Sequence, residues 1–235
     1  MILKTLQDLL QRYQDAGLLR VLDDFEELDA KPPSELAAAS SQVIDFHSSD
    51  YLGLATDQEF RARFLDALAQ DRLMAVGSGG SRTASGNSPY HVALERKIAA
   101  FHGAEAALVF NSGFDANYGV FSSLPQPGDA IVYDRLCHAS IREGIRASRA
   151  SQKLRCEHNS TEDLRRVLGQ LATDPAFQSG DSNVFVAVES LYSMDADVCP
   201  LGEFSMAMKE IFPKGNAYMI VDEASHSPSL RRATT

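Results

Sequence analysis

Short apolar segments alternate with stretches of helical periodicity from about residue 89 onward. Four of the apolar segments predict strands: 106–110, 131–133, 184–188 and 218–221. Five helices are predicted around these strands. Three of them end at Gly103, near residue 124 and near residue 149, a fourth begins after its cap Ser160, and a fifth spans 201–212. Segments 184–188 and 218–221 are apolar at every position, which is typical of parallel strands covered on both faces. We therefore predict an α/β fold with a mainly parallel sheet flanked by helices.

The N-terminal part has a different pattern. Leucines at positions 3, 6 and 10 recur at helical spacing and predict an amphipathic helix within residues 1–20. Pro32 and Pro33 interrupt the pattern, because proline removes a backbone donor and restricts its neighbour. We therefore assign residues 1–40 to an N-terminal helical arm.

The large domain is expected over residues 41–224. It begins with a short strand at 43–46, and Thr56 with Glu59 forms a capping box at the start of the next helix. Residues 225–235 carry no strand or helix signal, and we expect them to be an aberrant tail.

Composition and charge narrow the function classes. The chain has 235 residues, 22 basic against 32 acidic side chains, and a net charge of −10. That balance argues against nucleic-acid binding, and no apolar run approaches the roughly 18–20 residues of a membrane span. Three scattered cysteines form no disulfide framework and no zinc-site spacing. We expect a cytoplasmic protein without a metal site, although mitochondrial and peroxisomal locations stay open.

Polar, site-capable residues follow each predicted strand. In open α/β sheets, ligands bind beyond the carboxyl ends of the strands. The candidate segments there are Asn111–Phe114, Asp134–Ser140, Glu189–Asp195 and Asp222–His226. The four segments together indicate one ligand site more strongly than any single motif does.

Each candidate also has a purely structural interpretation. Ser112–Phe114 is either a helix cap or an anion site at a helix N-terminus. His138 is either a hydrogen-bonded structural residue or a site residue, and Asp222 either caps a helix or pairs with a buried cation such as a protonated ring nitrogen. The glycine-rich Gly77–Arg82 is either a linker or part of an anion-binding loop. Cys137 is a poor nucleophile candidate, because adjacent residues such as His138 do not face each other.

The residues resemble one family as an ordered set. The matching strings are Ser49–Leu54, Gly77–Arg82, His91–Asn117, His138–Ser140, His158–Asn159, Ser193–Asp197 and Asp222–Ala224. They are similar in order and spacing to the α-oxoamine synthases, pyridoxal 5'-phosphate (PLP) enzymes of the class I and II aminotransferase type. The resemblance covers roughly residues 20 to 224 and implies the PLP-dependent transferase fold type I large domain.

The resemblance assigns roles to individual residues. His138 would stack on the pyridine ring, meet the substrate and act as the catalytic residue, and Asp222 would bind the protonated ring nitrogen. Arg20 would meet a substrate carboxylate. The positions implied for cofactor binding are Ser112, Gly113, Phe114, His138, Glu189, Ser193, Asp222 and Ala224.

The family chemistry implies the substrates. An α-oxoamine synthase condenses an amino acid with an acyl-CoA or acyl-carrier thioester, with PLP as the electron sink. We expect an activity like that of 8-amino-7-oxononanoate synthase, which joins alanine to a pimeloyl thioester in biotin synthesis. Glycine C-acetyltransferase, 5-aminolevulinate synthase and a serine-palmitoyltransferase-like activity remain alternatives. The family also implies a homodimer.

Some positions depart from the family pattern. Ser49 replaces an asparagine, and Ser225 separates Ala224 from His226 where the family has Asp-x-Ala-His. The last lysine, Lys214, precedes Asp222, whereas the family's Schiff-base lysine follows that aspartate. We therefore expect a large domain that stops before the catalytic lysine and is inactive by itself.

Two further function classes come from these departures. A chain without the lysine could serve as a non-catalytic partner of a complete subunit, as in serine palmitoyltransferase. A generic nucleotide-binding domain is disfavoured, because no predicted strand leads into Gly-x-Gly-x-x-Gly or a Walker loop.

Overall fold

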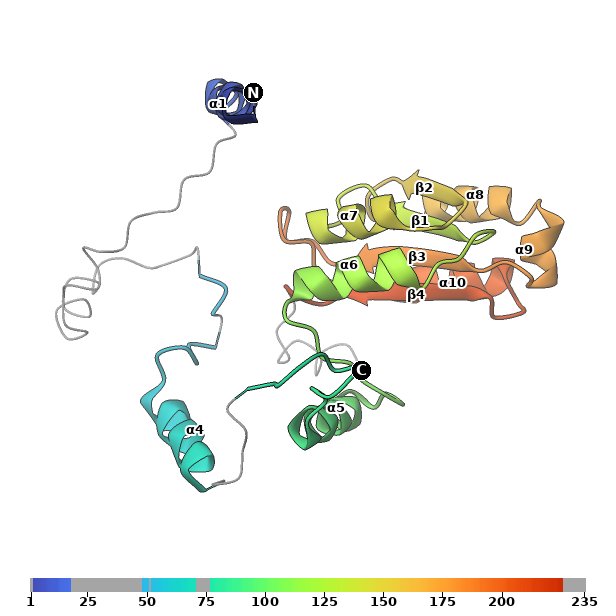
Figure 1. Ribbon diagram of the computed structural model, residues 1–235. Helices are drawn as coiled ribbons and strands as arrows, with labels where there is room; N and C mark the ends of the chain where they lie inside the picture. The colour runs from blue at the N-terminus through green and yellow to red at the C-terminus, as the bar shows by residue number, and fades with distance from the viewer. Residues whose placement is uncertain (1, 18–47, 51, 71–76, 226–235) are drawn as a thin grey trace. The chain divides into compact units, whose positions relative to one another are not determined.

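The structure, a computed structural model, describes residues 2–17, 48–50, 52–70 and 77–225. It divides into two compact units, Met1–Asp50 and Tyr51–Thr235. Helix α1 (Ile2–Asp15) belongs to the first unit and confirms the predicted N-terminal helix (Figure 1). The predicted strand at 43–46 and the substrate residue Arg20 lie outside the described residues. Of the helices described, none combines the length and the apolar character needed to cross a bilayer.

Two helices come before the sheet and its covering helices in the described part of the second unit. Helix α4 (Gln58–Gln70) is capped by Asp57, whose Oδ1 accepts from the Phe60 N–H at 2.6 Å. The predicted cap at Thr56 is therefore wrong by one residue, because the carboxylate of Asp57 satisfies the free N–H group. Helix α5 (Pro89–His102) begins after its cap Ser88. It ends as predicted at Gly103, whose φ of 63° suits glycine.

Within the described residues, the sheet has four strands, and all of its strand pairs are parallel. It contains β1 (Ala130–Asp134), β2 (Gln152–Cys156), β3 (Val184–Glu189) and β4 (Ala217–Asp222). The spatial order is β2-β1-β3-β4, so the chain crosses from one side of β1 to the other between β2 and β3. The register places Glu189 beside Asp222 at the ends of β3 and β4. This arrangement confirms the predicted α/β class.

Five helices cover the two faces of the sheet. They are α6 (Gly113–Ser123), α7 (Ala139–Ala147), α8 (Thr161–Leu171), α9 (Pro175–Ser179) and α10 (Leu201–Ile211). Helices α6 and α7 pack together on one face, and α8 and α10 lie on the other (Figure 1). Ser160 caps α8 as predicted, because its Oγ accepts from the Asp163 N–H at 3.1 Å.

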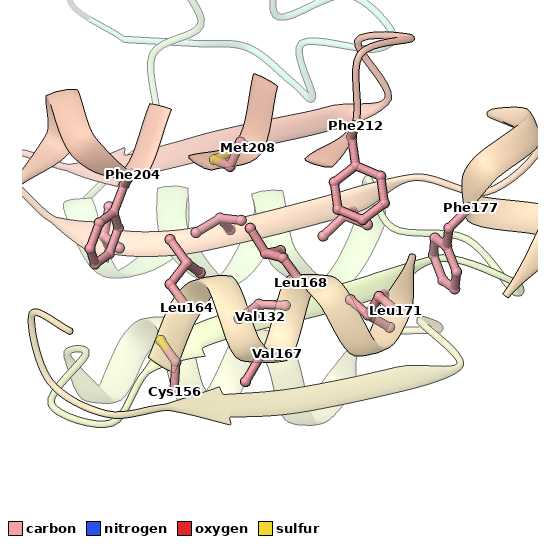
Figure 2. Close-up of a cluster of buried hydrophobic side chains, with 14 of the residues drawn as sticks. Val132, Cys156, Leu164, Val167, Leu168, Leu171, Phe177, Phe204, Met208 and Phe212 are labelled. Atoms are coloured by element: carbon pink, nitrogen blue, oxygen red, sulfur yellow. The ribbon is translucent and has the colours of Figure 1, made fainter. Parts of the chain in front are cut away.

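The strands contribute alternate residues to two cores. Val184 and Val186 belong to the same buried cluster as residues of α8 and α10. Leu164, Leu168 and Phe204 of that cluster are labelled in Figure 2. The opposite face of the same strand, at Phe185 and Ala187, packs with Phe121 of α6 and Ile141 of α7. Burial on both faces explains why the strand is apolar at every position.

The predicted strand at 106–110 is wrong. These residues belong to no strand, and Leu108 is 65% exposed. The Val109 N–H donates to Glu95 Oε1 at 2.9 Å, so a side chain takes the place of a neighbouring strand. Apolar composition alone could not supply the strand partner that a ladder needs.

The sequence pattern missed strand β2. From Lys153 to Cys156 its residues alternate between polar and apolar, and the burial alternates with them. This strand pairs with β1 on one side and lies at the edge of the described sheet, so its exposed face keeps polar residues. The short helix α9 was also missed, because five residues show no helical periodicity.

Helix α10 allows a matched test of the core. Phe204 is fully buried, and Met206 on the same helix is 55% exposed. We expect Phe204→Ala to lower the free energy of unfolding by about 3–5 kcal/mol, because it removes packed atoms and leaves a cavity. Met206→Ala is expected to change it by less than about 0.5 kcal/mol. Urea denaturation of both variants measures this, and equal losses would show that α10 is not packed as described.

Candidate functional site

Three neighbouring strands end in carboxylates. Asp134, Glu189 and Asp222 are the last residues of β1, β3 and β4. Because these strands are parallel and adjacent, the three side chains lie along one edge of the sheet. Asp134 is fully buried and Glu189 is 4% exposed. Buried carboxylates require hydrogen bonds or a cation, so each one must be satisfied by a specific partner.

Asp222 is held by two donors. Its Oδ2 accepts from Asn117 Nδ2 of α6 at 2.7 Å, and its Oδ1 accepts from the Ala224 N–H at 2.8 Å. The described residues that follow, 223–225, contain a turn and no helix, so Asp222 does not cap a helix there. Ala224 thus contributes its backbone N–H to the orientation of this carboxylate.

A chain of hydrogen bonds joins Asp222 to His138. Asn117 Nδ2 also donates to Ser140 Oγ at 3.0 Å, and Ser140 Oγ lies 2.8 Å from His138 Nδ1. Because the hydroxyl oxygen accepts from Asn117, its proton is free to point at Nδ1, which also accepts from the Ser140 N–H at 3.2 Å. Nδ1 therefore acts as an acceptor, and the neutral ring carries its proton on Nε2.

His138 caps helix α7 and is exposed. Its backbone N–H donates to Glu189 Oε1 at 2.6 Å, which connects α7 to the end of β3. The ring of Phe114 meets the imidazole edge-on, with centroids 6.4 Å apart. The structural interpretation of His138 therefore applies to its hydrogen-bonded backbone, whereas its ring remains accessible and its role at the site stays a prediction.

The start of helix α6 lies open. Ser112 is its cap, and the Oγ accepts from the Asp115 N–H at 3.0 Å. A Cβ added at Gly113 would meet no atom within 4 Å among the described residues, and Phe114 is exposed. The N–H groups of the first helical turn have no acceptor inside the helix. This end of α6 can therefore receive an anionic group.

Glu189 and Ser193 meet at the end of β3. Burial raises the pKa of the Glu189 carboxyl, the His138 and Ser193 backbone N–H groups counteract that rise, and the nearby Asp222 charge adds to it. Ser193 itself is exposed. Glu189 thus orients His138 through the backbone and does not project into open space.

The structure brings together most of the residues expected at the site. Phe114, His138, Glu189, Asp222 and Ala224 are joined by ring contacts or hydrogen bonds. The sequence reasoning gave no role to Asn117 or Ser140, although both belong to the family strings. Asn117 follows Gly113 by four residues, so the helical spacing could have placed it on the same face of α6.

The glycine-rich segment is not a plain linker, because it forms a turn that holds Arg82 in place, whereas its interpretation as an anion-binding loop stays a prediction. Arg82 contacts both carboxylate oxygens of Glu95, at 2.6 and 2.9 Å, and donates to Asn87 Oδ1 at 3.1 and 3.0 Å. The hydrogen bond from Arg82 is the main cause that lowers the pKa of Glu95 to about 2. A side chain on Gly86 would collide with the carbonyl of Gly80, at 1.7 Å. The glycines therefore allow a tight turn that positions Arg82.

Cys137 is buried, and its Sγ donates to the Ala187 carbonyl at 3.4 Å. Burial raises the pKa of this thiol far above its usual value, with the Asp134 charge adding to the rise. A thiol that stays protonated is a poor nucleophile, which agrees with the sequence argument against it.

The raised pKa of Glu189 predicts a pH-dependent effect. An acid whose pKa in the folded protein lies above its ordinary value of 4.5 destabilises the folded state as the pH rises from 4.5 through the folded pKa, because burial opposes its ionisation. Glutamine does not ionise, so we expect the free energy of unfolding of Glu189→Gln, relative to that of the parent, to increase as the pH rises above 4.5. Unfolding free energies of both proteins across the pH range measure this. Parallel pH profiles would contradict it, and the exposed Glu162→Gln is the control.

Known proteins are similar to this chain in sequence. An 8-amino-7-oxononanoate synthase of Emericella nidulans is 52% identical over 192 residues, covering 81% of this chain and 47% of that protein. A serine palmitoyltransferase of Caulobacter vibrioides is 35% identical over 97% of this chain and 52% of its own length. The chain thus spans about half the length of these curated relatives.

Solved structures and a family model agree with these relatives. A serine palmitoyltransferase structure that contains PLP superposes with a TM-score of 0.64 at 28% identity, covering 87% of this chain and 53% of that one. The family and that structure point to PLP as the cofactor, as the sequence predicted. The family model described as aminotransferase class I and II matches residues 41–226. The chain therefore belongs to the aminotransferase class I and II family, and its relatives are α-oxoamine synthases, as the motifs predicted.

Proposed function

We propose that this chain forms the PLP-binding part of an α-oxoamine synthase. The observation that carries the proposal is the hydrogen-bonded chain from Asp222 through Asn117 and Ser140 to His138. It holds a carboxylate and an accessible imidazole in fixed orientations at the carboxyl edge of a parallel sheet. That edge is where open α/β sheets bind their ligands.

The residues present fit PLP. The Asp222 carboxylate suits a protonated pyridine nitrogen, since its two oxygens can accept further hydrogen bonds beside those from Asn117 and Ala224. The exposed rings of His138 and Phe114 suit a flat aromatic group. The open N-terminus of α6 at Gly113 suits a phosphate.

PLP, when bound, supplies an electron sink for a negative charge at the α-carbon of an amino acid. Asp222 would keep the ring nitrogen protonated, and Asn117 would keep Asp222 in place. His138, with its proton on Nε2, could donate a hydrogen bond toward the substrate. Ser112, Gly113, Glu189 and Ser193 complete the cofactor surroundings in this proposal.

The proposed substrates are an amino acid and an acyl-CoA or acyl-carrier thioester. Alanine with a pimeloyl thioester is our first candidate, because the 8-amino-7-oxononanoate synthase of Emericella nidulans is 52% identical. Serine with a long-chain acyl thioester is the second, because the Caulobacter serine palmitoyltransferase aligns with 97% of this chain. A homodimer and the contribution of Arg20 to substrate binding belong to the same proposal.

Replacing Asp222 tests the cofactor assignment. We expect Asp222→Ala to weaken PLP binding by about 1.5–3 kcal/mol, the contribution of a hydrogen bond to a charged group. That loss corresponds to roughly a 10- to 150-fold increase in Kd. PLP titration followed by absorption measures it.

The exposed Asp181, which precedes β3 at the opposite edge of the sheet, provides the matched control. Asp181→Ala should bind PLP like the parent. Unchanged affinity in Asp222→Ala, with binding abolished by His138→Ala, would show that the ring lies elsewhere.

The amino-acid preference distinguishes the two candidate substrates. If the first candidate is right, L-alanine should change the absorption of the PLP-loaded chain at lower concentration than L-serine does. A side-chain hydroxyl needs a hydrogen-bonding partner that a site for alanine does not provide. The opposite order of the two titrations would favour the serine-using alternative.

A further inference from the structure

His158 lies between two carboxylates. It belongs to the loop between β2 and α8, and its Nδ1 is 2.8 Å from Asp134 Oδ1. Its Nε2 is 2.7 Å from Asp197 Oδ2. An ionised carboxylate only accepts hydrogen bonds, so both ring nitrogens must donate, and an imidazole donates from both only when it is protonated. The geometry therefore requires an imidazolium at this position.

Asp134 explains why a cation is needed. This carboxylate is fully buried at the end of β1 and also accepts from the backbone N–H groups of Leu136 at 2.8 Å and Asn159 at 2.9 Å. The neighbouring Arg135 pairs instead with Glu157. Within the described part of the chain, His158 is the cation in contact with Asp134. A buried carboxylate without a counter-charge would be strongly destabilising.

Asp197 connects this cation to the segment that follows β3. Residues 190–199 form a short hairpin, in which Leu191 bridges Val198 and the Cys199 N–H donates to the Ser190 carbonyl at 3.1 Å. The His158 ring also packs edge-on against Tyr192, with centroids 4.5 Å apart. His158 thus contacts both arms of the hairpin.

The hairpin carries a proposed site residue. Ser193 follows Tyr192 directly, its backbone N–H helps to lower the pKa of the Glu189 carboxyl, and Glu189 Oε1 accepts from the His138 N–H at 2.6 Å. The position of Tyr192 therefore determines where Ser193 and its contact with Glu189 lie.

We infer that His158 is a positioning residue, whose protonated ring fastens the 190–199 hairpin to the end of β1 and so places Ser193 and Glu189. The effect on PLP rests on the proposed function, whereas the fastening of the hairpin does not. The charged or titratable groups that face the ring are Asp134, Asp197 and Tyr192, and the neutral Asn159 amide also donates to Asp197 Oδ2 at 2.7 Å.

The contact of His158 with Asp134 and Asp197 depends on pH, because it requires the protonated ring. Burial lowers the pKa of the ring, but the hydrogen bonds and charges of the two carboxylates outweigh it, and the net pKa is raised. A base with a raised folded pKa contributes fully below its ordinary value of 6.5 and loses that contribution as the pH rises through the folded pKa. The hairpin should therefore loosen on the alkaline side of pH 6.5.

Ring-nitrogen NMR and amide hydrogen exchange on the parent chain test the inference. Both nitrogens of His158 should carry protons at pH 6.5. Exchange of the 192–198 amides should accelerate at least about tenfold in His158→Gln, in line with the loss of a charge-assisted hydrogen bond. Exchange at α9 should not change. His102→Gln, an exposed histidine of α5, is the matched control.

Asp197→Ala covers the case in which His158→Gln fails to fold. It leaves Asp134 paired with His158 and detaches the hairpin alone, so the same amides should exchange faster. A His158 ring with one protonated nitrogen at pH 6.5, or unchanged exchange in Asp197→Ala, would overturn the fastening.

PLP titration of the same variants separates the two proposals. We expect Asp197→Ala to weaken PLP binding several-fold as the hairpin loosens. A looser hairpin with unchanged PLP affinity would refute the positioning role. A parent chain that binds no PLP, with faster hairpin exchange in Asp197→Ala, would refute the proposed function and leave the fastening of the hairpin intact.

Discussion

The structure depends on satisfying three carboxylates at one edge of a parallel sheet. Adjacent parallel strands bring Asp134, Glu189 and Asp222 to the same edge, where burial penalises the charges of Asp134 and Glu189, while Asp222 is partly buried. Each is satisfied differently. Asp134 has the His158 cation, Glu189 has the backbone N–H groups of His138 and Ser193, and Asp222 has the Asn117 amide and a backbone N–H. The surrounding loops and helices are held in place by these contacts.

The different partners of the three carboxylates suit them to different roles. A carboxylate paired with a protein cation is electrically satisfied and serves to fasten loops, which describes Asp134. A carboxylate held by neutral donors keeps its charge available, which describes Asp222. The available negative charge at this edge is thus that of Asp222, whereas the open start of α6 carries the positive end of the helix dipole. A cationic ring nitrogen together with an anionic phosphate would match this distribution.

Local sequence signals predicted the strand at 184–188, which is buried on both faces, the strand at 218–221, which is only partly buried, and several helix caps. The strands at 184–188 and 218–221 and the caps at Ser112 and Ser160 follow from composition and side-chain chemistry at short range. The predictions failed where neighbours decide the structure. Residues 106–110 have strand composition but no strand beside them in the described chain, and β2 is polar because it lies at a sheet edge.

For the site, the sequence by itself determined which chemical groups are present, because polar residues after apolar strands and the family motifs mark His138, Glu189 and Asp222. The tertiary structure decided how they are connected. Asn117 reaches Asp222 across 105 positions of sequence, and His158 reaches Asp197 across 39. Such contacts arise only when helices and strands pack, since hydrogen bonds act over about 3 Å and sequence patterns report on near neighbours alone.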